Sequence, residues 1–267
     1  MKGRVLIVAG SDSGGGAGIQ ADIKTVTALG GYAMTAITAL TAQDTTGVHG
    51  IFAVPADFVA QQMRLARADI GADCLKTGML HRADVIAAVA AAIREFAPDV
   101  PVVVDPVMMA KGGQALLAAD AMAAMRDGIV PLATIVTPNI PEAEALSGLK
   151  IVDAEAAARA ARMILALGPK GVLIKGGHLA GAGITDILVQ GGQTAEAFQG
   201  PRIDTPHTHG TGCTLASAIA VGIAQGLTVR DAVVRARRYV HKAIETAPGY
   251  GHGHGPLNHG HGIPDYH

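Results

Sequence analysis

The chain has 267 residues, of which 49% are hydrophobic and 16% charged, and its formal net charge is −1 at pH 7. This length suits one large α/β domain, and a charge so close to zero excludes a field that attracts nucleic acid or membrane surfaces. Four tyrosines, four phenylalanines and no tryptophan offer little for base stacking. Two cysteines in unlike contexts indicate a reducing compartment, and no apolar run has the length and composition of a signal peptide or a membrane span. We expect a cytoplasmic protein that binds small molecules, not nucleic acid or membranes.

Short apolar runs alternate with helical patterns along the chain, beginning with a strand over residues 5–9 and a helix over 19–29. Further strands are expected over residues 32–40, 73–77, 101–104, 134–137 and 172–175, and helices over 58–68, 83–97, 115–126, from 140 onward, 154–167, 211–224 and 229–247. Residues 184–189 and 194–198 flank a Gly-Gly turn and predict a β-hairpin. This alternation predicts a mostly parallel sheet with helices on both faces, in one domain over residues 1–250. Residues 251–267, rich in glycine and histidine, are expected to form a mostly mobile tail.

Polar loops follow most of the predicted strands. They read SDSGGG, QDTTG, KTGM, DPVM, TPN and KGGH in chain order. Ligands of parallel sheets bind beyond the carboxyl ends of the strands, where such loops meet. The sequence therefore predicts a ligand site at that edge of the sheet.

A small-residue loop, GTGCT, enters the predicted helix over 211–224. Glycines let backbone N–H groups turn inward, and the positive end of a helix attracts anions, so Gly210, Thr211 and Gly212 form a candidate phosphate cradle. Cys213 stands in the first helical turn, where a thiol pKa is typically lowered, and it is a candidate base. The alternative is a glycine-rich helix start followed by a buried core cysteine.

Polar and charged residues at other strand ends are candidates for binding Mg²⁺ and phosphate. Asp105 ends a strand, and Asn139 and Glu142 are three apart at a helix start, so they share one face and suit a hydrated Mg²⁺. Lys175, beside two glycines, is a candidate phosphate contact. The alternatives are helix capping for Asn139 and a solvated lysine for Lys175.

The first half of the chain offers candidates for recognition of a heterocycle. The Gln43 amide carries a donor and an acceptor, and Met79 could supply an apolar floor, although methionine is more often core packing. Asp12 and Asp22 flank the first glycine-rich loop, where either could simply start a helix. That loop fits G-x-G-x-x-A only loosely, and no Gly-Lys dipeptide occurs, which excludes a P-loop.

Taken together, these stretches resemble the hydroxymethylpyrimidine/phosphomethylpyrimidine kinases of thiamine synthesis, which are ribokinase-like kinases. The long glycine-containing run and the cysteine of GTGC are the specific parts, because most sugar kinases of the superfamily carry aspartate there. The matching stretches run from residue 9 to about 259 in the family's order: AGSDSGGGAGIQADIKT, TALTAQDTTGV, KTGML, VVVDPVMMAKGG, TPNIPEAE, IKGGH, GTGCTLASAIA and GHGPLNH.

The resemblance implies a ribokinase-like fold, which is a three-layer αβα sandwich. It also implies a kinase that uses ATP and Mg²⁺ to phosphorylate 4-amino-5-hydroxymethyl-2-methylpyrimidine and then its monophosphate. Members of the family are usually homodimers. Cys213 would be the base, and His209 is a lower-ranked candidate for that role. One departure is Asp44, where the family usually has Asn. The implied roles are substrate binding for Gln43, Asp22, Met79, Val107 and Gly10, ATP binding for Lys175, Thr208 and Asn139, metal binding for Asp105 and Glu142, and an anion hole and catalysis for Gly210, Thr211, Gly212 and Cys213.

Three other functions remain open at this point. Pyridoxal or pyridoxamine kinase activity is the nearest, because related kinases of the same fold accept that heterocycle. A dinucleotide-dependent dehydrogenase would use Gly16 and Gly18. A non-catalytic binding protein would need the polar edge but not Asp105 and Glu142 together with GTGC.

Overall fold

The computed structural model describes residues 1–110, 113–118, 120–178 and 183–264. Within these residues a nine-stranded sheet has the strand order β3-β2-β1-β4-β5-β6-β7-β8-β9. The six strands from β2 to β7 in that order run parallel, while β3 pairs antiparallel with β2, and β8 with both β7 and β9. The strands are β1 (Arg4–Asp12), β2 (Tyr32–Gln43), β3 (Val48–Ala53), β4 (Cys74–Thr77), β5 (Val102–Val104), β6 (Ile135–Val136), β7 (Gly171–Ile174), β8 (Gly183–Gln190) and β9 (Glu196–Pro201).

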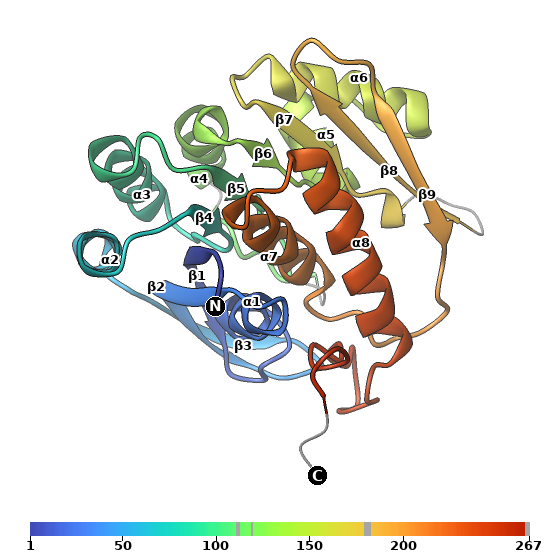
Figure 1. The fold of residues 1–267 in the computed structure, drawn as a ribbon, viewed down its shortest axis with the longest axis horizontal. Helices are drawn as coiled ribbons and strands as arrows, with labels where there is room; N and C mark the ends of the chain where they lie inside the picture. The colour runs from blue at the N-terminus through green and yellow to red at the C-terminus, as the bar shows by residue number, and fades with distance from the viewer. Residues whose placement is uncertain (111–112, 119, 179–182, 265–267) are drawn as a thin grey trace.

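Helices cover both faces of the sheet (Figure 1). Alternate residues of β1 enter different cores: Leu6 and Val8 pack with helices α2 to α6, and Val5 and Ile7 with α1, α7 and α8. Strands buried on both faces are therefore apolar throughout, and the expected three-layer, mostly parallel architecture is confirmed. The helices are α1 (Gly18–Ala28), α2 (Ala56–Asp69), α3 (Ala83–Phe96), α4 (Ala121–Ala124), α5 (Ile140–Ser147), α6 (Ala154–Leu165), α7 (Thr211–Ala224) and α8 (Val229–Glu245). Across the described residues, no helix combines the length and apolar composition that a membrane crossing needs.

Two local predictions were wrong. The expected helix over 115–126 is only the short α4, followed by a π-helical turn (Met125–Ile129). Ahead of it Ala115 bridges Met109, and the Leu116 and Leu117 amides bond to the Met108 carbonyl, so tertiary pairing overrides helix propensity. The sequence reading also omitted β3, because its edge position leaves the strand only partly buried and without an apolar pattern.

The C-terminal segment (residues 252–261) is packed on the body of the protein, contrary to the expected mobility. His259 is only 5% exposed, and its Nε2 lies 2.9 Å from Thr214 Oγ1 at the start of α7. Tyr239 on α8 donates its hydroxyl to the His259 carbonyl at 2.6 Å. At the other end of the segment, the Gly253 amide donates to Thr45 Oγ1 in the β2–β3 turn. Hydrogen bonds therefore order a sequence whose composition alone is typical of a flexible end.

We expect a chain that ends at Asn258 to be less stable than the full chain by about 2 kcal/mol, because Thr214 and Tyr239 each lose a hydrogen-bond partner worth about 1 kcal/mol. Urea denaturation measures this difference. A chain that ends at Gly262 is the control, since it keeps His259 and removes only Ile263, which is 51% exposed, and the four residues that follow. Equal unfolding midpoints for the two truncations would contradict the docking of His259.

Candidate active site

A cavity of ≈ 980 Å³ lies at the carboxyl ends of the parallel strands. It is lined by loops that follow β1, β2, β4, β5, β6 and β7 and by the start of α7, as expected from the polar loops. Asp22 is the one predicted site residue that does not line it. The predicted residues that do are Gly10, Gln43, Met79, Asp105, Val107, Asn139, Glu142, Lys175, Thr208, Gly210, Thr211, Gly212 and Cys213.

The N-terminus of α7 opens into this cavity. Gly210 precedes the helix with φ of 80°, and a Cβ there would stand 1.9 Å from the Gly16 carbonyl oxygen, so only glycine allows the two loops to meet. No side chain caps α7, which leaves its first-turn amides available to an acceptor. A Cβ on Gly212 would lie 3.2 Å from Lys175 Nζ, so the helix start and this ammonium border the same space. The arrangement suits an anion with several oxygens.

The pKa of the Cys213 thiol is raised, whereas the sequence predicted a lowered pKa. Burial raises the pKa of Cys213 to about 11, although Lys76 and the Gly18 backbone amide act to lower it. The expectation of a lowered pKa considered only the helix terminus and neglected desolvation. Cys213 is therefore a neutral thiol at pH 7.

Two carboxylates and one ammonium form the polar centre of the cavity. Lys175 Nζ donates to Asp105 Oδ1 at 2.9 Å, and the Asp105 carboxylate is only 2% exposed. Burial raises the pKa of Glu142 to about 7; the nearby Asp105 charge adds to the rise and Lys175 opposes it. The two carboxylates therefore repel each other in a buried site, and a cation beside them would lower this repulsion.

Asn139 and Glu142 form a capping box at the start of α5. Asn139 Oδ1 accepts from the Glu142 amide at 2.9 Å, and Glu142 Oε2 accepts from the Asn139 amide at 2.8 Å. The capping alternative for Asn139 is therefore observed, although both residues also line the cavity. The box holds the Glu142 carboxylate at the cavity wall.

Asp22 lies behind the cavity in a fully buried ion pair. Lys76 Nζ lies 2.9 Å from each Asp22 carboxylate oxygen, and Ser217 donates to Oδ1 at 2.7 Å. Burial by itself would lower the pKa of Lys76, but the negative charge of Asp22 raises it above its ordinary value. Both side chains are 0% exposed, but Lys76 lines the cavity and Asp22 does not, so Asp22 lies one residue behind the cavity wall.

Lys76 was missed as a site residue. A lysine within the buried strand CLKT was the available signal, since a fully buried lysine requires a partner. Its partner, Asp22, is 54 positions away in the sequence. The pair therefore becomes visible only in the folded chain.

The heterocycle residues gather around β2 and the loops beside it. Gln43 ends β2, and Met79 packs with Ala39 and Leu116 in a small apolar cluster against which Val107 rests. Gly10 lies against Met79, since a Cβ there would be 3.1 Å from its sulfur. An amide and an apolar surface thus line the same cavity.

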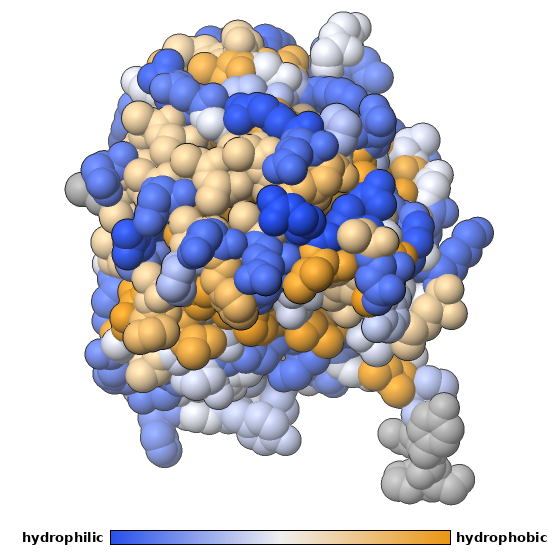
Figure 2. All heavy atoms as spheres, turned by 90° about the vertical axis from the view of Figure 1, so that its left-hand side faces the viewer, coloured by the Kyte–Doolittle hydropathy of each residue, from blue (hydrophilic) through white to orange (hydrophobic). Residues whose placement is uncertain are grey.

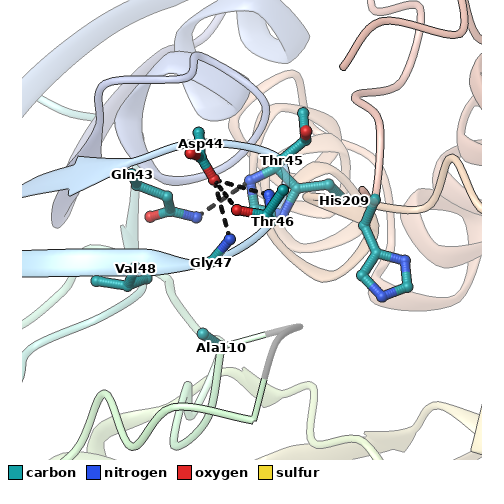
Figure 3. Close-up of a pocket in the computed structure, with 9 residues that line it drawn as sticks. Gln43, Asp44, Thr45, Thr46, Gly47, Val48, Ala110 and His209 are labelled. Carbon is teal, nitrogen blue, oxygen red and sulfur yellow. Dashed lines mark hydrogen bonds between the residues drawn. The ribbon is translucent and has the colours of Figure 1, made fainter. Parts of the chain in front are cut away.

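Asp44 turns its carboxylate into its own turn. Figure 3 shows Gln43 and residues 44–47 on one side of a small pocket, with Ala110 across from them. Asp44 Oδ1 accepts from the Thr46 amide at 2.8 Å and from the Gly47 amide at 3.1 Å. The hydrogen bonds from Thr46 and His49 hold the pKa of this carboxyl well below its ordinary value. The Asp44 side chain therefore stabilises the β2–β3 turn.

His209 bridges the two halves of the cavity. Its Nε2 lies 2.9 Å from Asp12 Oδ2 and 3.2 Å from Gln43 Nε2. With that nitrogen occupied, His209 is a weaker candidate for the base than Cys213.

The chain is similar in sequence and in fold to known proteins. The sequence model of the family described as phosphomethylpyrimidine kinase matches residues 12–258. The chain belongs to the phosphomethylpyrimidine kinase family. It is 53% identical over 258 residues to the thiamine biosynthesis bifunctional protein ThiED of Geobacter sulfurreducens, of whose length it spans only 52%. It is 48% identical to the hydroxymethylpyrimidine/phosphomethylpyrimidine kinase of Streptomyces coelicolor, with 96% of this chain and 94% of that protein covered.

A solved structure extends the likeness from sequence to fold. The pyridoxal kinase of Staphylococcus aureus, in complex with AMP-PCP and pyridoxal, superposes with a TM-score of 0.89 and 35% identity, covering 97% of this chain and 94% of that one. The expected ribokinase-like fold of this phosphomethylpyrimidine kinase family member is therefore confirmed, and the chain is a kinase.

Proposed function

We propose that the protein uses ATP to phosphorylate 4-amino-5-hydroxymethyl-2-methylpyrimidine and then the resulting monophosphate, in thiamine diphosphate synthesis in the cytoplasm. The observation that carries the proposal is that one cavity joins Gln43, an amide suited to an aminopyrimidine, to the uncapped start of α7 and to Asp105, Glu142 and Lys175. Phosphoryl transfer depends on positioning and charge stabilisation, and these groups supply both.

Each part of the cavity has a place in the proposed reaction. The first-turn amides of α7 bind the transferring phosphoryl group, and the thiolate form of Cys213, a small fraction at pH 7, accepts the proton of the attacking alcohol. Lys175 contacts the ATP phosphates, and Thr208 and Asn139, which also line the cavity, contact the nucleotide. Met79, Val107 and Gly10 form the apolar surface beneath the ring.

Asp105 and Glu142 fit a Mg²⁺ ion that is bound together with ATP. Mg²⁺ takes one or two carboxylates and completes its shell with phosphates and water, so two protein ligands suffice. The raised pKa of Glu142 supports this fit, because a cation would relieve the repulsion between the two buried carboxylates. The ion would neutralise charge on the ATP phosphates.

Pyridoxal is the second candidate substrate. The favouring observation is the structural likeness to a pyridoxal kinase, at 35% identity. The pyrimidine is preferred because identity to the Streptomyces coelicolor kinase reaches 48% over nearly the whole chain.

ADP release with each heterocycle and with sugars, measured side by side, tests the function. We expect turnover with hydroxymethylpyrimidine and none with ribose or fructose 6-phosphate, because Gln43 and Met79 offer too few partners for sugar hydroxyls. Equal or greater turnover with a sugar overturns the proposal, and greater turnover with pyridoxal selects the second candidate.

Replacement of Gln43 by leucine is expected to weaken pyrimidine binding about tenfold to a hundredfold and to leave ATP affinity nearly unchanged. Losing one paired polar contact costs about 1–3 kcal/mol, and Gln43 ends β2, away from Lys175 after β7. Calorimetric titration with each ligand measures both affinities. An equal loss for ATP would contradict the assignment of the two ligands to different ends of the cavity.

We also propose that the protein is a homodimer that pairs through the β2–β3 edge of the sheet. Phe52 on β3 is 69% exposed and lies opposite Leu40 of β2, which is 46% exposed. Nearby on α2, Phe58 and Leu65 are also exposed, and Figure 2 shows hydrophobic residues gathered on this side of the molecule. Exposed aromatic residues on an edge strand are typical of an interface. Light scattering of the wild type and of Phe52→Lys tests this, and a monomeric wild type overturns it.

A further inference from the structure

The Gln43 amide lies between two polar groups, His209 on one side and Thr41 on the other. Its Nε2 lies 3.2 Å from His209 Nε2, and its Oε1 is 3.1 Å from Thr41 Oγ1. The amide oxygen and nitrogen exchange places on a half-turn of the terminal torsion, so hydrogen-bond chemistry decides which atom faces which neighbour. Both neighbours can be assigned from the contacts that they make elsewhere.

His209 must present a proton from Nε2. The Asp12 carboxylate accepts from the amides of Gly14 at 2.8 Å, Gly16 at 3.1 Å and Ala17 at 2.8 Å, and from His209 Nε2 at 2.9 Å. Burial alone would raise the pKa of Asp12, but the bonds from His209 and these amides bring it below its ordinary value. An ionised Asp12 can only accept, and therefore the facing nitrogen of His209 is the donor. That nitrogen has one proton and no lone pair for an amide N–H, so a Gln43 nitrogen beside it would set donor against donor, whereas a Gln43 oxygen shares the N–H with Asp12.

Thr41 must present a lone pair to the amide. Its hydroxyl has one proton, and Oγ1 lies 2.9 Å from the Ser11 carbonyl oxygen, which can only accept. With the proton directed to Ser11, the contact between Thr41 and Gln43 requires a donor from the amide. The nitrogen of Gln43 therefore belongs beside Thr41, and the oxygen beside the His209 N–H.

We propose that His209, held by Asp12, is a positioning residue that fixes the polarity of the Gln43 amide and thereby the orientation of the pyrimidine. The inference rests on the proposed function. The amide has one oxygen lone pair left on the His209 side and one N–H left on the Thr41 side. These match the 4-amino group and the adjacent ring nitrogen of the substrate, as in amide recognition of adenine.

This polarity determines where the reactive group lies. The hydroxymethyl carbon is next to the carbon that bears the amino group, on the side away from the paired ring nitrogen. When the amino group pairs with the oxygen beside His209, the hydroxymethyl group lies on the His209 side, and His209 immediately precedes Gly210 and the start of α7. The reversed amide would turn the alcohol toward Thr41 and away from the phosphate cradle.

The test compares two substrates whose edges have opposite polarity: hydroxymethylpyrimidine and its analogue with an oxo group in place of the 4-amino group. We expect His209→Leu to lower kcat/KM for the amino substrate about tenfold to a hundredfold, to leave that for the oxo analogue unchanged or raised, and to leave the KM for ATP unchanged. His209→Gln, whose amide can donate to Asp12 and Gln43, is expected to restore the preference. An equal loss for both substrates, or an unchanged ratio, overturns the inference.

Two further variants keep the result interpretable. Thr41→Val removes the acceptor on the other side of the amide and is expected to reduce the preference as well, so it decides the matter where His209→Leu fails to fold. In a Gln43→Leu background, His209→Leu is expected to leave the ratio of kcat/KM for the amino substrate to that for the oxo analogue unchanged. Additive effects of the two replacements on this ratio would show that His209 does not act through Gln43 and would overturn the inference. Absence of wild-type turnover with the amino substrate would instead refute the proposed function.

Discussion

Replacement of Cys213 by alanine is expected to slow phosphorylation of the alcohol by about 10²–10⁴-fold and phosphorylation of the monophosphate much less. The alcohol must lose a proton as it attacks, whereas a phosphate monoester, with a second pKa near about 6, is already largely ionised at pH 7. The first-turn amides of α7 survive the substitution and still bind the phosphoryl group. Each step is measured separately with its own purified substrate. Equal loss in both steps would mean that Cys213 shapes the anion site and transfers no proton.

The raised pKa of Cys213 adds a pH dependence to this prediction. Burial raises that pKa to about 11, so the thiolate fraction increases about tenfold for each unit of pH between 7 and 9. The first phosphorylation is therefore expected to accelerate with rising pH in that range, and the second is not. Cys213→Ala is the control, since its residual rate lacks the thiolate. A first step equally fast at pH 7 and pH 9 contradicts the base assignment.

Replacement of Lys76 by methionine is expected to lower the free energy of unfolding by about 3–5 kcal/mol. Asp22 would then be a fully buried carboxylate without its ion-pair partner, and Ser217 alone cannot compensate its charge. Urea denaturation measures the loss. The paired replacement Lys76→Met with Asp22→Leu is expected to recover most of it, because removing both charges also removes the desolvation cost.

A matched control uses an exposed ion pair on α6. Arg159 and Glu155 are also 2.9 Å apart, but their side chains are 52% and 84% exposed. Glu155→Gln is expected to change stability very little, since solvent screens such pairs. A similar effect of Lys76→Met and Glu155→Gln would show that burial does not govern the Lys76 pair.

Local features of the fold could be predicted from the sequence. The start of α7 at Thr211 follows from a glycine loop entering an Ala-rich run, and the hairpin β8–β9 from its Gly-Gly turn. The carboxyl ends of parallel strands lie at one edge of the sheet. Loops that are far apart in the sequence therefore line the same cavity. These signals are local in the chain or follow from topology.

The features that could not be predicted depend on contacts between distant segments. Lys76 meets Asp22 only in the folded chain, and His259 is ordered by Thr214 on α7. The thiol of Cys213 is controlled by its burial, which a helix-terminus rule does not include. The composition of a segment indicates how much conformational entropy is lost when the segment becomes ordered. Whether tertiary hydrogen bonds offset that loss depends on distant residues, which composition does not describe.

The position of the C-terminal segment has a consequence for the order in which the active site forms during synthesis. Residues 252–261 bond to the β2–β3 turn through Thr45, to His209 through the Gly255 carbonyl, and to α7 through Thr214. A chain emerging from the ribosome presents its N-terminal elements first, so the sheet and α7 can pack before this segment has been translated. The core of the nascent kinase can therefore form first. Only afterwards does the C-terminal segment connect the β2–β3 turn, His209 and the start of α7 to one another.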